Sequence, residues 1–537
     1  MKMRAILISM LAVAIAAASC NKDEDSGRSS GQKPQVDVAY LGGRIDSGAS
    51  TYANGNGDVA SENVAEESDV QKAYAVTFDS NKQKLDVVSL KVTEYGITNG
   101  SNGNKVPQTG VAVNPDSKYL LVVLNPSTGL LAAMHNAVSF ADFQKKLDGN
   151  ISEFTQANNF TMINYGDFPG SQLTSTEIPM PEITKGVNLF VVDQENNAEA
   201  AIQEALKTPV RVTVGRLSVK VALMNQLNQD LVQGNVAKGA SACSLTGWQF
   251  SVVNKSYLAY SSIVPYMDGS TIVADHRRYR QDGNFDAAVD PETEFIFLKN
   301  RDNIATAATP IKWFNDQTQY VMENTMAADA QLKGHTTTMI AKAIYTPEGI
   351  DGVNGGDTWI SIIKDEVETR YSVENARAQA TGDTNIKSLF DQIAKAQGYA
   401  DATEFFDALN VDNNDAKLDN VGYTAAKYQV EDAGTVYYAR VYRKSVCYYD
   451  VQIMHNNTLE GTMALGKYGV VRNNHYTINF KEIKAPGLPF IPDPTDPDII
   501  DKGNPDVNDK DEDSNAYISV TISIQPWTLW TQDVVIG

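Results

Sequence analysis

Apolar and polar residues alternate along two stretches of the sequence, and this pattern restricts the chain to folds built mainly from β-sheet. In residues 210–223 (VRVTVGRLSVKVAL) and 517–524 (YISVTISI) apolar residues recur every second position, as the buried face of a strand requires. Shorter β-branched or apolar runs bounded by Asn, Asp, Gly and Ser predict further strands. These runs lie at 36–41, 73–78, 85–92, 120–124, 249–253, 295–298, 338–345, 359–363, 436–442, 448–454 and 476–483.

Helices are predicted at only a few places. Helical spacing of apolar residues occurs at 140–147, 198–206, 386–396 and 402–409. Gly398 stands where a glycine would end the third of these helices. Many strands with a few helices in their connections predict a mainly β chain made of β-sandwich domains. The polar stretch at residues 226–241 is the predicted boundary between two such domains.

The chain is long enough for two or more domains and too acidic for a typical nucleic-acid-binding protein. Its 537 residues exceed the size of one ordinary domain. Aromatic residues make up 9% and charged residues 21% of the chain, which favours a folded protein over a disordered one. The formal net charge is -21, whereas binding to phosphates needs clustered Lys and Arg. We therefore expect no nucleic acid among its partners.

The N-terminus predicts export and lipidation. Lys2 and Arg4 precede an apolar run that is too short to span a bilayer and is typical of a signal peptide, here residues 1–19. Small residues precede Cys20 as they do at a bacterial lipobox, so we expect Cys20 to be acylated after cleavage. A plain secretory signal with an incidental cysteine is the alternative. Residues 21–34 have the composition of a flexible linker.

The sequence contains no motif for catalysis or metal binding. Walker A, G-x-S-x-G and cysteine–histidine protease motifs are absent, and the five histidines form no H-x-H or HExxH pair. A G-x-G-x-x-A match at residues 55–60 follows no apolar strand, so it predicts a loop. We expect no enzyme activity, no cofactor and no metal. Cys243 and Cys447 are compatible with one disulfide or with two separate buried thiols.

The C-terminal region changes character twice. Residues 485–515 carry six prolines and a dense run of acids, which predicts an extended, self-repelling linker. The tail that follows has the cleanest alternation in the chain, with its apolar positions at Ile518, Val520, Ile522, Ile524, Trp527 and Leu529. Burying its four aliphatic side chains contributes roughly 6–12 kcal/mol before the ordering cost. The tail is expected either to fold back into its own domain or to insert into another subunit as a donor strand.

Motifs near the C-terminus resemble the C-terminal region of Bacteroidetes fimbrillins, the subunits of type V pili, and specifically the minor-fimbria shaft type. These motifs are Val-Arg-Asn-Asn-x-Tyr at 471–476, Gly-Leu-Pro-Phe-Ile-Pro at 487–492 and Pro-Trp-Thr-Leu at 526–529. Asn473 and Asn474 suit a turn that needs left-handed backbone. The first motif is therefore expected to be structural and not catalytic.

The resemblance implies two transthyretin-like Greek-key β-sandwich domains and assembly by donor-strand exchange. Such subunits are exported as lipoproteins, and an Arg-specific protease then removes the first strand and opens a groove. The C-terminal strand of a neighbouring subunit fills that groove. Head-to-tail exchange of this kind does not close on itself, so it builds an open filament.

Mapped onto this sequence, the strand to be removed is 36–41, with Val36, Val38 and Tyr40 on one face. Cleavage would fall between Arg44 and Ile45, because Gly42 and Gly43 make the chain flexible there. Arg28 is the alternative cut, but it precedes the strand and would open nothing.

The sequence therefore predicts a structural shaft subunit of a cell-surface fimbria, whose precursor is an outer-membrane lipoprotein. Its expected partners are identical subunits, fimbrial anchor and tip or accessory subunits, the maturation protease and the outer membrane. The alternatives are a tip or accessory fimbrial adhesin, and a surface glycan-binding or hydrolytic lipoprotein. The predicted segments are the signal peptide 1–19, a lipidated propeptide 20–44, sandwich domains 45–235 and 236–485, an acidic linker 486–515 and a donor strand 516–537.

Overall fold

The computed structural model describes a set of segments that belong to one compact unit beginning at Val38. The described residues are 39–41, 65–67, 69–90, 111–164, 180–191, 198–205, 207, 210–264, 266–268, 271–273, 279–286, 290–300, 311–411, 414–456, 459, 462–511, 518–526 and 530–534. The signal peptide and several predicted site residues lie outside them, and their roles stay predictions. These residues are Cys20, Val36, Val38, Arg44, Ile45, Trp527 and Leu529.

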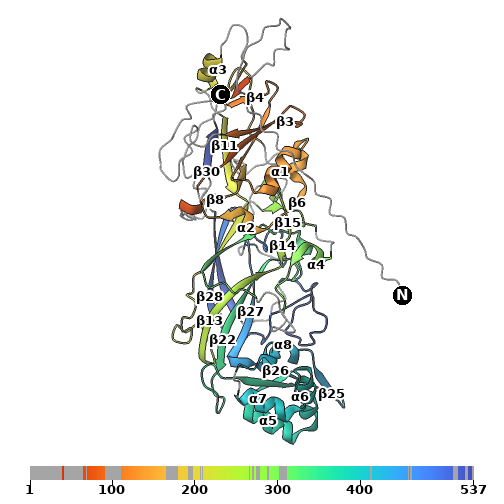
Figure 1. Cartoon of the computed structure of the whole chain (residues 1–537). Coiled ribbons are helices and arrows are strands. Elements are labelled where there is room, and N and C mark those ends of the chain that lie inside the picture. Colours follow the sequence, from red (N-terminus) through yellow and green to blue (C-terminus); the bar gives the residue numbers. More distant parts are fainter. Residues whose placement is uncertain are drawn as a thin grey trace, which may run out of the picture. The chain divides into compact units, whose positions relative to one another are not determined.

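Two sheets form the first sandwich (Figure 1). The larger has the strand order β3 (Lys84–Leu90), β2 (Ala73–Phe78), β5 (Tyr119–Leu124), β9 (Met162–Asn164), β11 (Val210–Arg216) and β30 (Trp530–Val534). The smaller has the order β10 (Leu189–Val191), β1 (Ala39–Leu41) and β4 (Val111–Val113). One buried cluster joins Val122 and Val212 of the larger sheet to Val113 and Leu189 of the smaller. Burial of apolar side chains between the two sheets is what holds them together.

The other face of the larger sheet is covered by connecting segments. Val76 and Leu121 share a buried cluster with Leu130 of α1 (Thr128–Asn136) and Phe140 of η2 (Phe140–Gln144). Helix α1 begins at Ser127, whose hydroxyl accepts a hydrogen bond from the Leu130 N–H. The short elements in these connections are η1 (Ala65–Glu67), β6 (Lys146–Asp148), α2 (Ile151–Phe154), β7 (Thr155–Gln156), β8 (Asn159–Phe160) and α3 (Ala198–Ala205).

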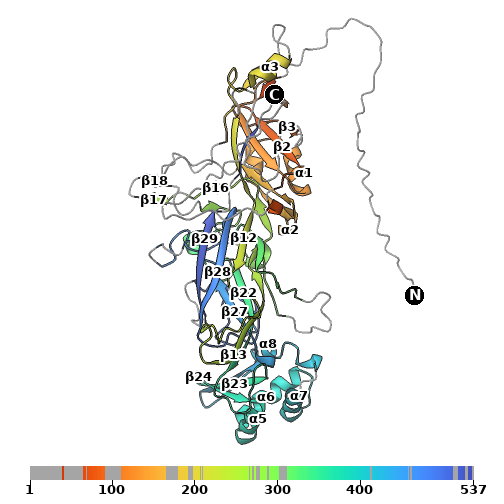
Figure 2. The ribbon, with the colours of Figure 1, turned by 90° about the vertical axis from the view of Figure 1, so that its left-hand side faces the viewer.

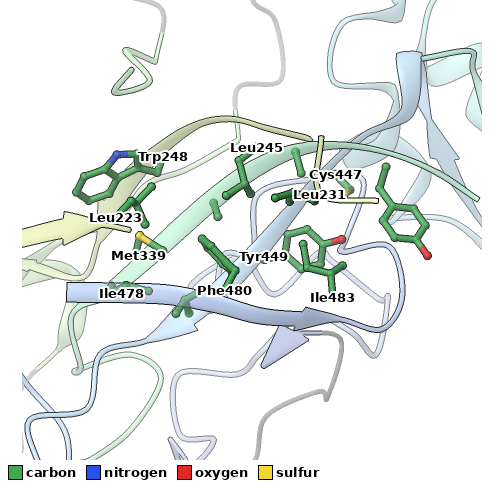
Figure 3. Close-up of a cluster of buried hydrophobic side chains, with 14 of the residues drawn as sticks. Leu223, Leu231, Leu245, Trp248, Met339, Cys447, Tyr449, Ile478, Phe480 and Ile483 are labelled. Carbon is green, nitrogen blue, oxygen red and sulfur yellow. The ribbon is translucent and has the colours of Figure 1, made fainter. Parts of the chain in front are cut away.

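The second sandwich also consists of two sheets. One has the order β21 (Thr318–Met322), β12 (Ser218–Leu223), β28 (Asn474–Ile483) and β29 (Ile518–Pro526), and the other β13 (Ala240–Ser251), β22 (Thr338–Pro347) and β27 (Val446–Gln452). Figure 3 shows the core between them, where Ile478 and Phe480 from one sheet meet Leu245, Met339 and Tyr449 from the other. Short elements nearby are β14 (Val253–Asn254), β15 (Ser256–Leu258), β16 (Ser262–Ile263), β17 (Tyr266–Asp268), β18 (Thr271–Val273), β19 (Arg280–Gln281), α4 (Pro291–Glu294), β20 (Phe295–Ile296) and η5 (Ala328–Ala330).

A separate α/β module is inserted between β22 and β27 (Figure 2). Its sheet has the order β24 (Val367–Ser372), β23 (Trp359–Lys364), β26 (Thr435–Tyr442) and β25 (Gln429–Asp432). Its helices are α5 (Val373–Gly382), α6 (Thr384–Ala396), α7 (Ala402–Val411) and α8 (Val421–Ala425). The short helix η6 (Ala416–Leu418) lies between α7 and α8. The helices and the sheet share one buried cluster, which includes Ile360, Phe390 and Phe405. Gly398 has a φ of +81°, as a glycine that ends a helix requires.

The mainly β class with a few helices is confirmed, and one predicted strand is divided between two sheets. The predicted strand 210–223 is two strands, β11 and β12, which enter different sheets on either side of Leu217. The change of sheet lies at Leu217, and the domain boundary at the polar stretch 226–241 stays a prediction. The apolar positions change phase at this point, from 210, 212 and 214 to 217, 219, 221 and 223. Residues on both faces of β12 are buried, so a period of two does not reveal which sheet each part joins. No helix among the described residues is both long and apolar enough to cross a membrane.

Candidate assembly site

Strand β1 fills a slot in the middle of the smaller sheet of the first sandwich. It pairs antiparallel with β4 on one side and with β10 on the other, and Tyr40 lies opposite both Ala112 and Phe190. In this sheet β4 and β10 do not pair with each other. The slot therefore has two strand edges, and the predicted removable segment supplies the strand that satisfies both.

The tail forms two strands that lie at sheet edges of its own chain. In β29, Val520, Ile522 and Ile524 stand opposite Phe480, Ile478 and Tyr476 of β28, which are all buried. Strand β30 pairs antiparallel with β11.

Of the two positions expected for the tail, its own domain or another subunit, the structure has the first, with the tail folded back on its own chain. Each tail strand pairs with a single neighbour, because β29 and β30 are the outermost strands of their sheets. Either one can leave without separating other paired strands.

The motif at 471–476 ties several segments together through a buried ion pair. The Arg472 guanidinium lies 2.7 Å from the Glu323 carboxylate, and both side chains are almost fully buried. Its remaining N–H groups donate to the carbonyl oxygens of Leu258 and Ala259 at 2.8 and 3.0 Å. A buried arginine needs this complete set of acceptors, because an unpaired charge is costly inside a protein.

Asn473 holds residues 216–218, where the chain passes from one sandwich to the other, through two hydrogen bonds. Its φ of +58° is left-handed, as predicted from the Asn-Asn sequence. Its side-chain oxygen accepts a hydrogen bond from the Arg216 N–H, and its own N–H donates to the Ser218 carbonyl, both at 2.9 Å. The two contacts bracket Leu217, where β11 ends and β12 begins. The structural role predicted for this motif is confirmed.

Glu67 fastens the first described turn after β1 to the two sandwiches. Its carboxylate accepts hydrogen bonds from Lys220 on β12 at 2.8 Å and from the Tyr320 hydroxyl on β21 at 2.6 Å. Burial and the adjacent Glu67 carboxylate raise the pKa of Tyr320 above its ordinary range. The Arg216 side chain donates to the Glu67 carbonyl at 3.0 Å. The chain is therefore anchored again at Glu67, independently of β1.

The acidic segment differs from the extended linker that the sequence predicts, at least as far as Asp511. Leu488, Phe490 and Ile491 are buried, and Leu488 exchanges backbone hydrogen bonds with Tyr448 of β27. Asp501 is fully buried and accepts two hydrogen bonds of 2.6 Å from Arg440. Asp501 and Asp496, which lies 3.3 Å from Lys427, thus have specific cationic partners, which composition alone does not reveal.

The two cysteines are separate thiols. Cys243 on β13 stands opposite Tyr345 of β22, and Cys447 on β27 opposite Ala343 of the same strand. Two strand spacings, about 9–10 Å, therefore separate them, which exceeds the reach of a disulfide. Both are buried and free, and burial raises the pKa of Cys447 to about 12, so both are unreactive thiols.

Among the described residues, no group of three or more His, Cys, Asp and Glu side chains could hold a metal ion. His455 instead hydrogen-bonds the Tyr476 hydroxyl at 2.6 Å in the buried core.

The described residues together form a β-sandwich protein in which β1 lies inside a sheet and the C-terminal strands β29 and β30 lie at sheet edges.

Comparison with known proteins points to fimbriae. Residues 440–533 match the sequence profile described as "Major fimbrial subunit protein type IV, Fimbrillin, C-terminal". This match includes all three C-terminal motifs, so the resemblance to fimbrillins is confirmed for that part of the chain, and the minor-fimbria shaft type stays a prediction. No curated protein matches the sequence.

Several solved structures are similar over most of the chain, at low sequence identity. A putative cell adhesion protein from Parabacteroides distasonis is 13% identical, with 92% of this chain and 100% of that chain covered and a TM-score of 0.37. One from Bacteroides eggerthii is 11% identical, with 93% and 98% covered and a TM-score of 0.33. The C-terminally truncated tip fimbrial protein Mfa3 from Porphyromonas gingivalis is 12% identical, with 91% and 100% covered and a TM-score of 0.30. At these scores the likeness does not distinguish a shaft from a tip subunit.

Proposed function

We propose that this chain is a structural subunit of a surface fimbria of the type V class and that it polymerises by strand exchange. The similarity of residues 440–533 to the fimbrillin C-terminal region supports the fimbrial role. The position of β1 between β4 and β10 is the observation that carries the assembly scheme. Removing a strand from the middle of a sheet leaves two unpaired edges, and an extended strand from another chain can satisfy both.

Maturation follows from the N-terminal sequence. The signal peptide directs export, Cys20 carries the lipid that tethers the precursor to the outer membrane, and an Arg-specific protease cuts between Arg44 and Ile45. The cut releases β1, while the buried Glu67–Lys220 pair keeps the next part of the chain attached to the sandwiches. The role is structural and not enzymatic.

The tail supplies the donor strand for the neighbouring subunit. It has the required length and alternation, and both of its strands are bound on one side only in the free subunit. A subunit that both accepts and donates a strand belongs in the shaft, between an anchor and a tip or accessory subunit. A tip or accessory adhesin is the alternative, and it would accept a strand without needing to donate one.

The test is a pair of arginine variants expressed in the native host. Arg44→Ala should leave β1 in its slot, so unpolymerised precursor should accumulate, whereas Arg28→Ala should assemble normally. N-terminal sequencing of filament subunits should give Ile45 as the first residue. Filaments that begin at Cys20 or Ser29, or normal filaments from Arg44→Ala, would contradict the scheme.

A further inference from the structure

The acidic segment ends in a backbone pairing with the loop that leads into β22. Residues 507–511, here called the anchor, run antiparallel to residues 331–334 of that loop. The Lys333 N–H, for example, donates to the Asp509 carbonyl at 2.9 Å. The pairing fixes the chain to the second sandwich a few residues before the tail begins.

Asp511 is the last described residue before the tail, and both its backbone and its side chain are held. Its N–H donates to the Gln331 carbonyl at 3.1 Å, and its carboxylate accepts a hydrogen bond from the Thr336 hydroxyl. The residue is only 1% exposed. A buried carboxylate depends on such donors, because burying it without them is costly. The chain is therefore firmly fixed at Asp511.

Gly334 makes the closest approach within the anchor pairing. Its N–H donates to the Val507 carbonyl at 3.1 Å. A Cβ atom at position 334 would lie 2.9 Å from that carbonyl oxygen and 3.0 Å from the Val507 Cβ. The two backbones can lie this close because glycine has no side chain. A bulkier residue at position 334 should therefore lift the anchor off the loop.

The acidic segment is also held upstream of the anchor. The Ile500 N–H donates to the Ala426 carbonyl at 3.0 Å, and the buried Asp501 carboxylate lies 2.6 Å from the Arg440 guanidinium. Releasing the anchor alone would therefore lengthen the free chain only as far back as Asp501.

The anchor limits how far the donor strand can reach. Strand β29 begins at Ile518, so six residues, 512–517, join it to Asp511. A fully extended chain spans at most about 3.6 Å per residue, so the Cα atom of Ile518 can lie no more than about 25 Å from that of Asp511. This reach is shorter than the diameter of a small domain, about 30 Å. A strand donated from here can enter only a slot that lies close to the anchor.

We propose that the surface around the anchor is the contact surface for the next subunit, a second copy of this chain, whose first sandwich lies against it when the tail enters its slot. The surface presents the exposed side chains of Asp506, Asn508 and Lys510. The inference rests on the proposed donor role of the tail and adds the face of the donating subunit that the acceptor occupies.

The first test places a photo-crosslinking amino acid at position 508 of the full-length subunit, expressed in the native host. Illumination of filaments should join this position to the first sandwich of the neighbouring subunit, and mass spectrometry of the digest should identify the crosslinked peptide. The same replacement in a subunit that lacks residues 515–537 is the control and should give no such product, because that subunit holds no neighbour by its tail. Filaments in which position 508 crosslinks to no other subunit would overturn the contact surface.

The second test shortens the chain between the anchor and β29. Deleting residues 513–515 keeps both but cuts the reach to about 14 Å, so filaments should be lost. Gly334→Val in the same background should restore them, because lifting the anchor returns length to the chain. Gly382→Val is the matched control and should not restore filaments, since a Cβ atom at position 382 meets no atom within 4 Å. Thr336→Val, which removes a donor to the Asp511 carboxylate, is a second releasing variant in case thermal melting shows that Gly334→Val alters the fold.

The outcomes separate this inference from the proposed function. Loss of filaments after the 513–515 deletion, restored by a releasing variant, supports the anchor. If filaments need residues 515–537 but form normally after the 513–515 deletion, the reach set by the anchor is overturned and donor-strand assembly still stands. Filaments that persist without residues 515–537 would overturn the donor role and this inference with it. A loss that neither releasing variant restores would show that the anchor does not limit the reach.

Discussion

Arg472 and Glu323 form a buried ion pair that ties the start of β28 to the end of β21. The pair is buried, and the Arg472 side chain also reaches the carbonyl oxygens of residues 258 and 259. Replacing one member of a buried pair is costly because the other is left as an uncompensated charge, whereas replacing both with apolar residues often costs little.

We therefore expect Arg472→Met to lower the free energy of unfolding by about 3–5 kcal/mol. Urea unfolding of the purified subunit would measure it. Arg377→Met is the control, since its pair with Asp407 is partly exposed and should be worth less than about 1 kcal/mol. The double variant Arg472→Met with Glu323→Leu should recover much of the loss. A cost for Arg472→Met no larger than for Arg377→Met would show that the pair is not a structural link.

His475 gives a pH dependence whose sign follows from its surroundings. Burial and the neighbouring Lys220 lower its pKa from 6.5 to about 4, and neither ring nitrogen has a hydrogen-bond partner among the described residues. Between about pH 4 and 6.5 the unfolded chain therefore binds more protons at this histidine than the folded chain does. The contribution of His475 to stability is accordingly present above pH 6.5 and is lost as pH falls toward 4.

We expect His475→Gln to flatten the stability profile between pH 6.5 and 4, by at most about 3 kcal/mol for a shift of this size. His135→Gln, at an exposed position of α1, is the control and should leave the profile unchanged. Denaturant midpoints measured across this pH range would report the difference. If stability falls with pH in parallel for the unmodified subunit and His475→Gln, the lowered pKa assigned to His475 would be wrong.

At the scale of elements, the sequence predicts strands better than it predicts their partners. Alternation identifies β11, β12 and β28, and helical spacing identifies α6 and α7. The position of β1 between two distant strands does not follow from local pattern, because pairing partners are chosen by the whole sheet. The sequence predicts only the helix pair of the α/β module, since the strands of the module resemble those of a sandwich. Amino-acid composition likewise does not predict which cation pairs with which acid, such as Arg440 with Asp501.

Strand β29 offers the sharpest test of insertion as a strand. Val520 and Ile522 stand opposite the buried positions Phe480 and Ile478 of β28, and Ser519 and Thr521 alternate with them. Val520→Asp or Ile522→Asp should abolish filaments, because a charge on the face that meets a core has no partner. Ser519→Asp or Thr521→Asp should be milder. Filament length by electron microscopy is the readout, and equal damage at both faces would refute strand insertion.

For the whole molecule, the slot and the tail are separable parts of the proposed assembly mechanism. The slot depends on β4 and β10, whereas the tail strands are the outermost members of two other sheets. Without the tail, β28 still pairs with β12, and β11 still pairs with β9. Under the proposed mechanism we therefore expect that a subunit can lose the donation of a strand and keep its acceptance, and that the reverse holds when β1 cannot be removed.

Deleting residues 515–537 should consequently leave a folded subunit with a near-normal circular dichroism spectrum and no filaments of its own. Added to unmodified subunits, the deletion variant should shorten filaments, because it accepts a donor strand and then offers none. Arg44→Ala should shorten them as well, from the opposite end, because it donates but cannot accept. Mixing the two defective subunits, with the protease present, should therefore give a heterodimer that resists dissociation on unheated gels and grows no further. Filaments formed by that mixture, or unchanged filament length after either addition, would show that the subunits do not join by exchanging this strand.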